Sequence, residues 1–191
     1  HRDSIRRDAG DQLLIAGSVA AGPGMVEACA HLAIAGRKAG LQPAFLFGAD
    51  PNLAAAARGF ARLLGHATGG TIELCHATSE AAWLSAIASA RLLVSGRFHY
   101  SIAAAWLGTP FIALDSNTPK MDGLMQTLGL GCRANSASSS LPVELLGQAL
   151  ALLDDPAPVE RIALQNPRVR AAAPYILGQA MLSAGEINRG A

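Results

Sequence analysis

The chain alternates short apolar runs with longer helix-forming stretches, and this alternation restricts its possible folds more than any other feature. The strand candidates are the apolar runs 13–16, 44–47, 71–75, 92–94 and 111–114. The stretches between and after them predict helices at 25–39, 51–64, 80–90, 101–107 and 122–128. Because right-handed crossovers between parallel strands put helices on both faces of a sheet, the pattern predicts an α/β, Rossmann-like, doubly wound parallel sheet of five or six strands. We expect the order 3-2-1-4-5-6, with residues 129–132 as the sixth strand.

The composition fits one compact domain and excludes several classes of protein. With 51% hydrophobic and 15% charged residues, the 191-residue chain is not disordered. A net charge of +1 argues against a nucleic-acid partner. No apolar run approaches the ~20 residues of a membrane span, and no signal peptide is evident. We therefore expect a cytoplasmic protein, with peripheral association at the inner membrane face left open.

The chain divides into three stretches of different character. Residues 1–12 are interpreted as a linker or the remnant of a segment between two lobes, 13–155 as the Rossmann-like domain, and 156–191 as a helical extension. The first residue is His1 and no initiator methionine precedes it, from which we expect a carboxyl-terminal portion of a longer protein. The three cysteines are scattered, which favours small hydrophobic roles in a reducing compartment, and none has metal-ligand spacing.

Polar and charged residues gather after two consecutive strand candidates. Arg97 and His99 follow the 92–94 run, and Ser116, Asn117 and Lys120 follow the 111–114 run. In an open α/β sheet the carboxyl ends of the strands form the ligand-binding edge. Two cations and an imidazole at that edge indicate an anionic ligand and a proton to be moved.

The same segment resembles the polysaccharide pyruvyltransferase family. The resemblance rests on the turn Ser95-Gly96-Arg97-Phe98-His99, the alanine-rich helix 101–107, the step Gly108-Thr109-Pro110 and the loop 116–120 that ends in lysine. Members transfer a pyruvyl group from phosphoenolpyruvate to a sugar, and they resemble two-domain glycosyltransferases of the B type (GT-B). The resemblance thus implies a phosphorylated donor, a saccharide acceptor, no further cofactor and a first lobe that has no counterpart here.

This resemblance also implies roles for the charged residues. Arg97 and Lys120 would hold the phosphate and carboxylate of the donor, and His99 would act as general acid or base. Each residue has a structural alternative. His99 could cap the following helix, and Arg97 could pair with Asp115 or Asp122 at the surface.

Smaller residues complete the candidate site. Ser116 and Asn117 offer a hydroxyl and an amide to the donor, although they also suit an ordinary turn. Ser95 and Gly96 are interpreted as residues that let the backbone turn and approach a ligand. Gly17 and Ser18 open a glycine loop that precedes a helix, an arrangement that can hold phosphate, although this loop is neither GxGxxG nor a Walker motif.

Two rival functions remain at this point. A sugar-nucleotide glycosyltransferase of GT-B type would use the same cations to bind a diphosphate. A non-catalytic binding module could keep the fold without the chemistry. Arg2 is a weaker candidate for ligand contact, and no role is assigned to His31, His66, His76, Trp83 or Trp106.

Overall fold

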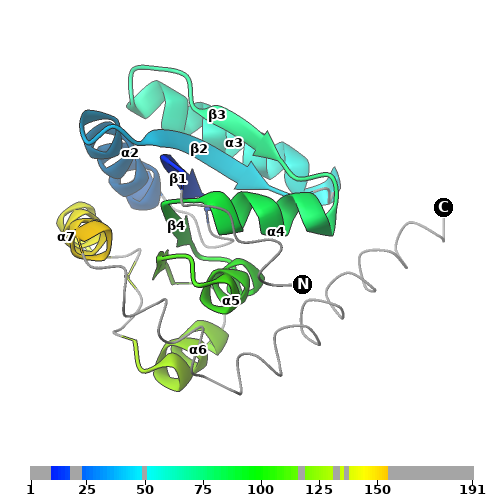
Figure 1. The fold of residues 1–191 in the computed structure, drawn as a ribbon. Coiled ribbons are helices and arrows are strands. Elements are labelled where there is room, and N and C mark those ends of the chain that lie inside the picture. The colour runs from blue at the N-terminus through cyan, green and yellow to red at the C-terminus, as the bar shows by residue number, and fades with distance from the viewer. Residues whose placement is uncertain are drawn as a thin grey trace.

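A computed structural model describes residues 10–17, 23–48, 51–115, 119–130, 134–135 and 138–154 of the chain. The strands are β1 (Gln12–Ile15), β2 (Gln42–Phe47), β3 (Glu73–His76), β4 (Leu92–Ser95) and β5 (Phe111–Ala113). The helices are α2 (Pro23–Lys38), α3 (Pro51–Ala67), α4 (Glu80–Ser89), α5 (Phe98–Leu107), α6 (Lys120–Leu128) and α7 (Leu141–Asp154). All strand pairs are parallel and form one sheet in the order β3-β2-β1-β4-β5, which Figure 1 shows between two layers of helices. The α/β doubly wound fold expected from the alternation is confirmed.

In the described part of the expected sixth strand, residues 129–130, the chain does not form a strand. Gly129 ends α6 in the left-handed conformation, with φ of 65°, and its N–H bonds back to the carbonyls of Met125 and Gln126. Beside β5, Leu114 and Ala134 form an isolated parallel bridge. In it the Ala134 N–H donates to the Ala113 carbonyl at 2.8 Å. The prediction is therefore wrong for 129–130, because glycine stops the helix there, and residues 131–133 lie outside the described ranges.

Proline at position 43 shows how the sheet accommodates a residue that cannot donate a hydrogen bond. Pro43 lies in β2, which has β1 on one side and β3 on the other. Gln42 N–H donates to the Asp11 carbonyl on the β1 side at 2.8 Å, so the nitrogen of Pro43 faces the β3 side. The pairing with β3 begins only at Ala44, opposite Glu73. The missing N–H therefore leaves no ladder bond unmade.

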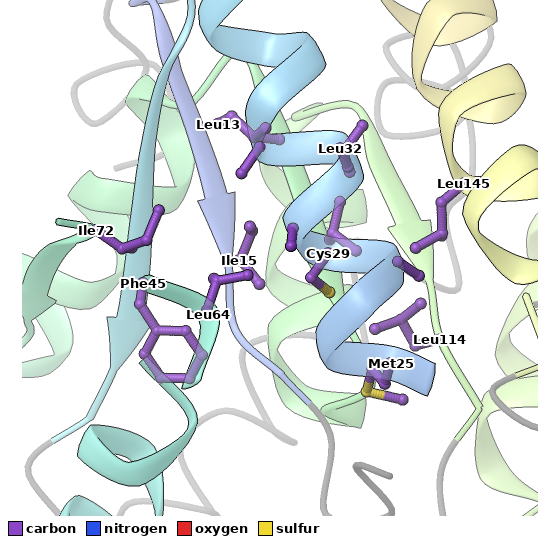
Figure 2. Close-up of a cluster of buried hydrophobic side chains, with 14 of the residues drawn as sticks. Leu13, Ile15, Met25, Cys29, Leu32, Phe45, Leu64, Ile72, Leu114 and Leu145 are labelled. Atoms are coloured by element: carbon purple, nitrogen blue, oxygen red, sulfur yellow. The ribbon is translucent and has the colours of Figure 1, made fainter. Parts of the chain in front are cut away.

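One apolar layer lies between the sheet and helices α2, α3 and α7. Leu13 and Ile15 of β1 point into it, and Met25, Cys29 and Leu32 of α2 cover them (Figure 2). Burial raises the pKa of the Cys29 thiol to about 12, so this cysteine serves as a small apolar side chain. Full burial of each such leucine or isoleucine contributes about 1.5–3 kcal/mol of hydrophobic free energy.

The opposite layer lies under α4, α5 and α6 and supports the carboxyl edge of β4. Leu14 of β1 and Leu93 of β4 are fully buried in it. Gly108 ends α5 in the left-handed conformation, and the buried Thr109 hydroxyl then donates to the Ile87 carbonyl at the end of α4, at 2.8 Å. This bond ties the carboxyl end of α5 to the carboxyl end of α4. Among the described helices, none is both long and apolar enough to cross a membrane.

Candidate active site

The candidate site lies where β1 and β4 run side by side and the order of the sheet reverses. The chain leaves β1 toward β2 and leaves β4 toward β5, so the crossovers diverge at this point (Figure 1). Gly96, directly after β4, donates its N–H to the Gly17 carbonyl after β1, at 2.8 Å. Gly17 has φ of +60°, and a Cβ there would stand 3.5 Å from the Phe45 ring. Glycine therefore lets the backbone turn away at the switch point, the usual ligand site of such sheets.

Ser95 shapes the turn that follows β4. Its side chain is fully buried, and its hydroxyl accepts the Arg97 N–H at 3.0 Å. The hydroxyl therefore satisfies a backbone donor within the turn and is not available as an exposed nucleophile.

Arg97 is the N-cap residue of α5, with an extended backbone and no side-chain hydrogen bond that caps the helix. Its carbonyl accepts the N–H groups of Tyr100 and Ser101, so the helix starts at Phe98. The expected start at residue 101 is thus three residues late, and His99 lies in the first turn of α5 instead of in a loop. The reason is tertiary, since α5 packs between β4, β5 and α4 and the fold extends it toward the sheet edge.

The charge of Lys120 acts on His99 at this edge. His99 keeps part of its ring exposed, but the surrounding protein lowers its pKa below the ordinary 6.5, and the Lys120 ammonium lowers it further. Lys120 is the first residue of α6, where the expectation had placed it at the end of a loop. Lys120, which follows β5, therefore lies near enough to the histidine that follows β4 for its charge to act on the imidazole.

Two helix N-termini meet this group of cations. Neither α5 nor α6 has a side-chain hydrogen bond that caps its first turn. The positive end of each helix dipole favours an anion. At the start of α6 Lys120 adds to that potential, although Asp122 in the same first turn offsets part of it. The edge is thus suited to bind a small, highly charged anion.

Two aromatic residues at the same edge were missed by the sequence analysis. The Tyr100 hydroxyl lies beside Gly48 at the end of β2, and its ring meets the Trp83 indole edge-on at 5.0 Å. Burial raises the Tyr100 pKa, while the charge of Arg97, the Trp83 indole and the Gly48 backbone act in the opposite direction. The Trp83 N–H is buried and completes no hydrogen bond of good geometry among the described residues. The position of Tyr100 directly after the RxH turn was the signal that could have found it.

The second missed residue is His76, at the carboxyl end of β3. Its ring stacks on Phe47, with centroids 4.6 Å apart and planes 5° from parallel. The sequence assigns His76 no role, because no partner lies at metal-ligand spacing from it. Two strands, β2 and β1, lie between β3 and β4 in the sheet, so His76 belongs to the far end of the edge.

Several candidate residues lie outside the described ranges, namely Arg2, Ser18, Ser116 and Asn117. Asp115 is described and has interactions of its own. In the part of the chain that the structure describes, no three His, Cys, Asp or Glu side chains are grouped to hold a metal ion.

A comparison with models of known protein families supports the resemblance drawn from the sequence. Residues 50–118 match the family model for polysaccharide pyruvyl transferase. The matched segment runs from the start of α3 to three residues beyond Asp115, and it includes Arg97 and His99 but stops just before Lys120. The family resemblance drawn from the residues is confirmed by a match that extends well upstream of the motif. No curated protein matches the chain.

Solved structures with the same fold are GT-B-like sugar enzymes. A mutant O-GlcNAc transferase from Thermobaculum terrenum aligns with TM-score 0.57 and 14% identity over 96% of this chain and 38% of that one. The glycotransferase of kitacinnamycin aligns with a TM-score of 0.56 and 19% identity, over 95% of this chain and 43% of that one. The UDP-GlcNAc 2-epimerase from Neisseria meningitidis, bound to UDP-GlcNAc, aligns with a TM-score of 0.60 and 15% identity, over 94% of this chain and 46% of that one. The chain thus spans less than half the length of each, and the likeness establishes the fold.

Proposed function

We propose that the chain is the donor-binding lobe of a polysaccharide pyruvyl transferase that uses phosphoenolpyruvate. The observation that carries this proposal is the family match over 50–118, which contains the Arg97–His99 turn at the switch point of the sheet. A transferase of this family is supported by that match, whereas the donor and the individual roles below are our inference.

Phosphoenolpyruvate suits the electrostatics of the edge because it carries a phosphate and a carboxylate on the same carbon atom, C2. Arg97 offers a planar guanidinium that can bind either group in a bidentate manner. Lys120 offers a compact charge at the start of α6, close enough to His99 to lower its pKa. We assign the two anionic groups to these two cations, with the amides at the start of α5 and α6 as further donors.

His99 is the group we assign to proton transfer. Because its pKa is lowered, the imidazole is neutral at pH 7 and can accept the proton of an acceptor hydroxyl. That oxygen then bonds to C2 of the donor while a proton reaches the methylene carbon, which becomes the methyl group. A second hydroxyl of the sugar then replaces phosphate at C2 and gives its proton to the departing phosphate, so the ketal forms and phosphate leaves with the electrons of the C–O bond.

The acceptor is a sugar of a polysaccharide, such as an exopolysaccharide, or of its lipid- or nucleotide-linked precursor. Since the chain spans less than half of the GT-B-like structures it resembles, we propose that a second lobe completes the acceptor site. Phosphoenolpyruvate is made in the cytoplasm, so we place the reaction there, including at the inner face of the membrane. The domain at 13–155 would supply donor binding in this arrangement.

Calorimetry with phosphoenolpyruvate tests the proposal directly, with 3-phosphoglycerate and UDP-GlcNAc as comparison ligands. We expect saturable binding of phosphoenolpyruvate that weakens when salt is raised, because the contacts are ionic. The rival glycosyltransferase is favoured by the GT-B-like neighbours, one of which holds UDP-GlcNAc. Binding of UDP-GlcNAc without binding of phosphoenolpyruvate would therefore favour the glycosyltransferase, and binding of neither would favour a non-catalytic module.

A further inference from the structure

A groove with a volume of about 1110 Å³ lies between α3 and β3, away from the candidate active site. Its floor is apolar, formed by Ala61, Ile72 and Leu74. Leu74 is 47% exposed although it is a strand residue, so the floor is open to solvent. Figure 1 shows α3 alongside β3 at the outer end of the sheet, where the described residues add no further strand. This face is therefore a surface on which an additional chain could lie.

The wall of the groove is basic. Arg58, Arg62 and His66 follow one another at four-residue intervals along α3, and all three side chains are exposed. Across from them, Arg37 of α2 donates to the Thr71 carbonyl at 2.7 Å, which adds a fourth basic group beside the loop before β3. None of the described residues that line the groove is acidic. The charge of the groove thus calls for an acidic occupant.

The backbone of β3 offers the second recognition element. Among the described strands β3 pairs only with β2, and the Ala77 N–H donates to the Phe47 carbonyl on that side at 2.9 Å. Because successive residues of a parallel strand direct their N–H and C=O to opposite sides, the peptide groups of Leu74 and His76 face away from β2. These groups can pair with an added strand, as an exposed sheet edge does when it captures an extended peptide.

The spacing of the arginines matches an extended chain. Arg58 and Arg62 are one helical turn apart, which is about 6 Å along the helix at ~1.5 Å per residue. Side chains on one face of a strand are two residues apart, or about 6.6 Å at ~3.3 Å per residue. Alternate carboxylates of a strand laid along β3 can therefore face both arginines, while the residue between them leaves its side chain on the opposite face.

We propose that this groove binds an extended acidic peptide of a partner protein, which adds as a strand to the free edge of β3. Backbone pairing with Leu74 and His76 supplies the orientation, and Arg58 and Arg62 select acidic residues at alternate positions. A saccharide is the less suitable occupant, because none of the described residues that line the groove is a Phe, Tyr or Trp on which a sugar ring could stack. This site is separate from the proposed donor site and does not depend on it.

The probe for the test is a fluorescent nine-residue peptide with glutamate at alternate positions and valine or threonine between them. We expect saturable binding by fluorescence anisotropy, weakened at least tenfold by Arg62→Glu. Lys38→Glu, which makes the same charge change at an exposed residue of α2 outside the groove lining, should alter the affinity less than threefold. Equal weakening by both substitutions would mean general charge attraction and would overturn the proposal.

Backbone methylation of the peptide separates strand addition from simple ion pairing without altering the protein. Methyl groups on the alternate nitrogens that face β3 should abolish binding, whereas methyl groups on the other set should leave it within threefold. If both methylated peptides bind as the parent does, no strand is added. Tighter binding of an oligogalacturonate than of the peptide, lost in Arg62→Glu, would also overturn the proposal and assign the groove to anionic saccharides.

Discussion

The unit β4–α5 and the unit α3–β3 are both made of a parallel strand and an adjoining helix, yet they differ in what they expose. All four residues of β4 are buried, and α5 is buried from Ser101 to Ala105. In β3, by contrast, Glu73, Leu74 and His76 are exposed, and α3 carries Arg58 and Arg62 on its outer flank. The first unit occupies the centre of the sheet and the second its border (Figure 1).

This difference explains where each kind of recognition can occur. A central strand has partners on both sides and helices on both faces, so only its carboxyl end can meet a ligand. That end is held rigidly, which suits residues that must be positioned for chemistry. An edge strand keeps one side of its backbone free, which suits association with another chain.

The largest effect should separate the two histidines at opposite ends of the carboxyl edge. In a protein that contains both lobes, we expect His99→Ala to reduce kcat by about 10²–10⁴-fold with little change in donor affinity, because it removes the proton-transferring group. The matched control is His76→Ala, which removes the ring stacked on Phe47 and should leave kcat within threefold. Steady-state kinetics on both variants make the comparison. A folded His99→Ala variant with normal turnover would contradict the catalytic role.

The next effect concerns stability and compares one leucine from each unit. Leu93→Ala in β4 should lower the free energy of unfolding by about 2–5 kcal/mol, because it leaves a cavity in a fully buried layer. Leu74→Ala in β3 should change it by about 0.5 kcal/mol or less, since that side chain is half exposed. Urea unfolding followed by circular dichroism measures both. Similar losses would show that the edge is packed as tightly as the centre.

Arginine substitutions give a smaller, ligand-specific contrast. Arg97→Ala should raise the Kd for phosphoenolpyruvate about 10- to 100-fold, as expected for the loss of charge-assisted hydrogen bonds of about 1.5–3 kcal/mol. Arg62→Ala, in the groove beside β3, should leave that Kd within twofold. Calorimetry on the two variants distinguishes them. Unchanged affinity after Arg97→Ala would remove this residue from the donor site.

The smallest expected effect is on the titration of His99. Lys120→Ala should raise the His99 pKa toward 6.5 without reaching it, because burial, the larger cause of the shift, remains. The pKa of His99 is lower in the folded state than in the unfolded state, so as pH falls the unfolded state binds the proton first. The free energy of unfolding therefore decreases as pH drops below about 6.5. This loss should be smaller in the variant. Histidine NMR titration measures the shift, with Lys38→Ala as the control that should leave it unchanged.

The sequence was sufficient to predict the strand–helix alternation and the strand order β3-β2-β1-β4-β5. It was less successful at element boundaries that depend on distant contacts. The start of α5 was placed three residues late, and Gly129 was assigned to a strand although it ends α6. The groove beside β3 was not foreseen at all, because Arg37 and Thr71, which meet there, are 34 residues apart.

What the sequence by itself determined is local in origin. Apolar runs, glycine and proline steps and the turn from Ser95 to His99 depend on neighbouring residues, so short-range preferences are enough to indicate them. Only the tertiary structure decided that Gly96 would bond to Gly17, that Lys120 would reach His99, and that β3 would be left at the border. These relations join segments far apart in the chain, and they are fixed by how the crossovers pack on the two faces of the sheet, a global balance of burial that no local pattern contains.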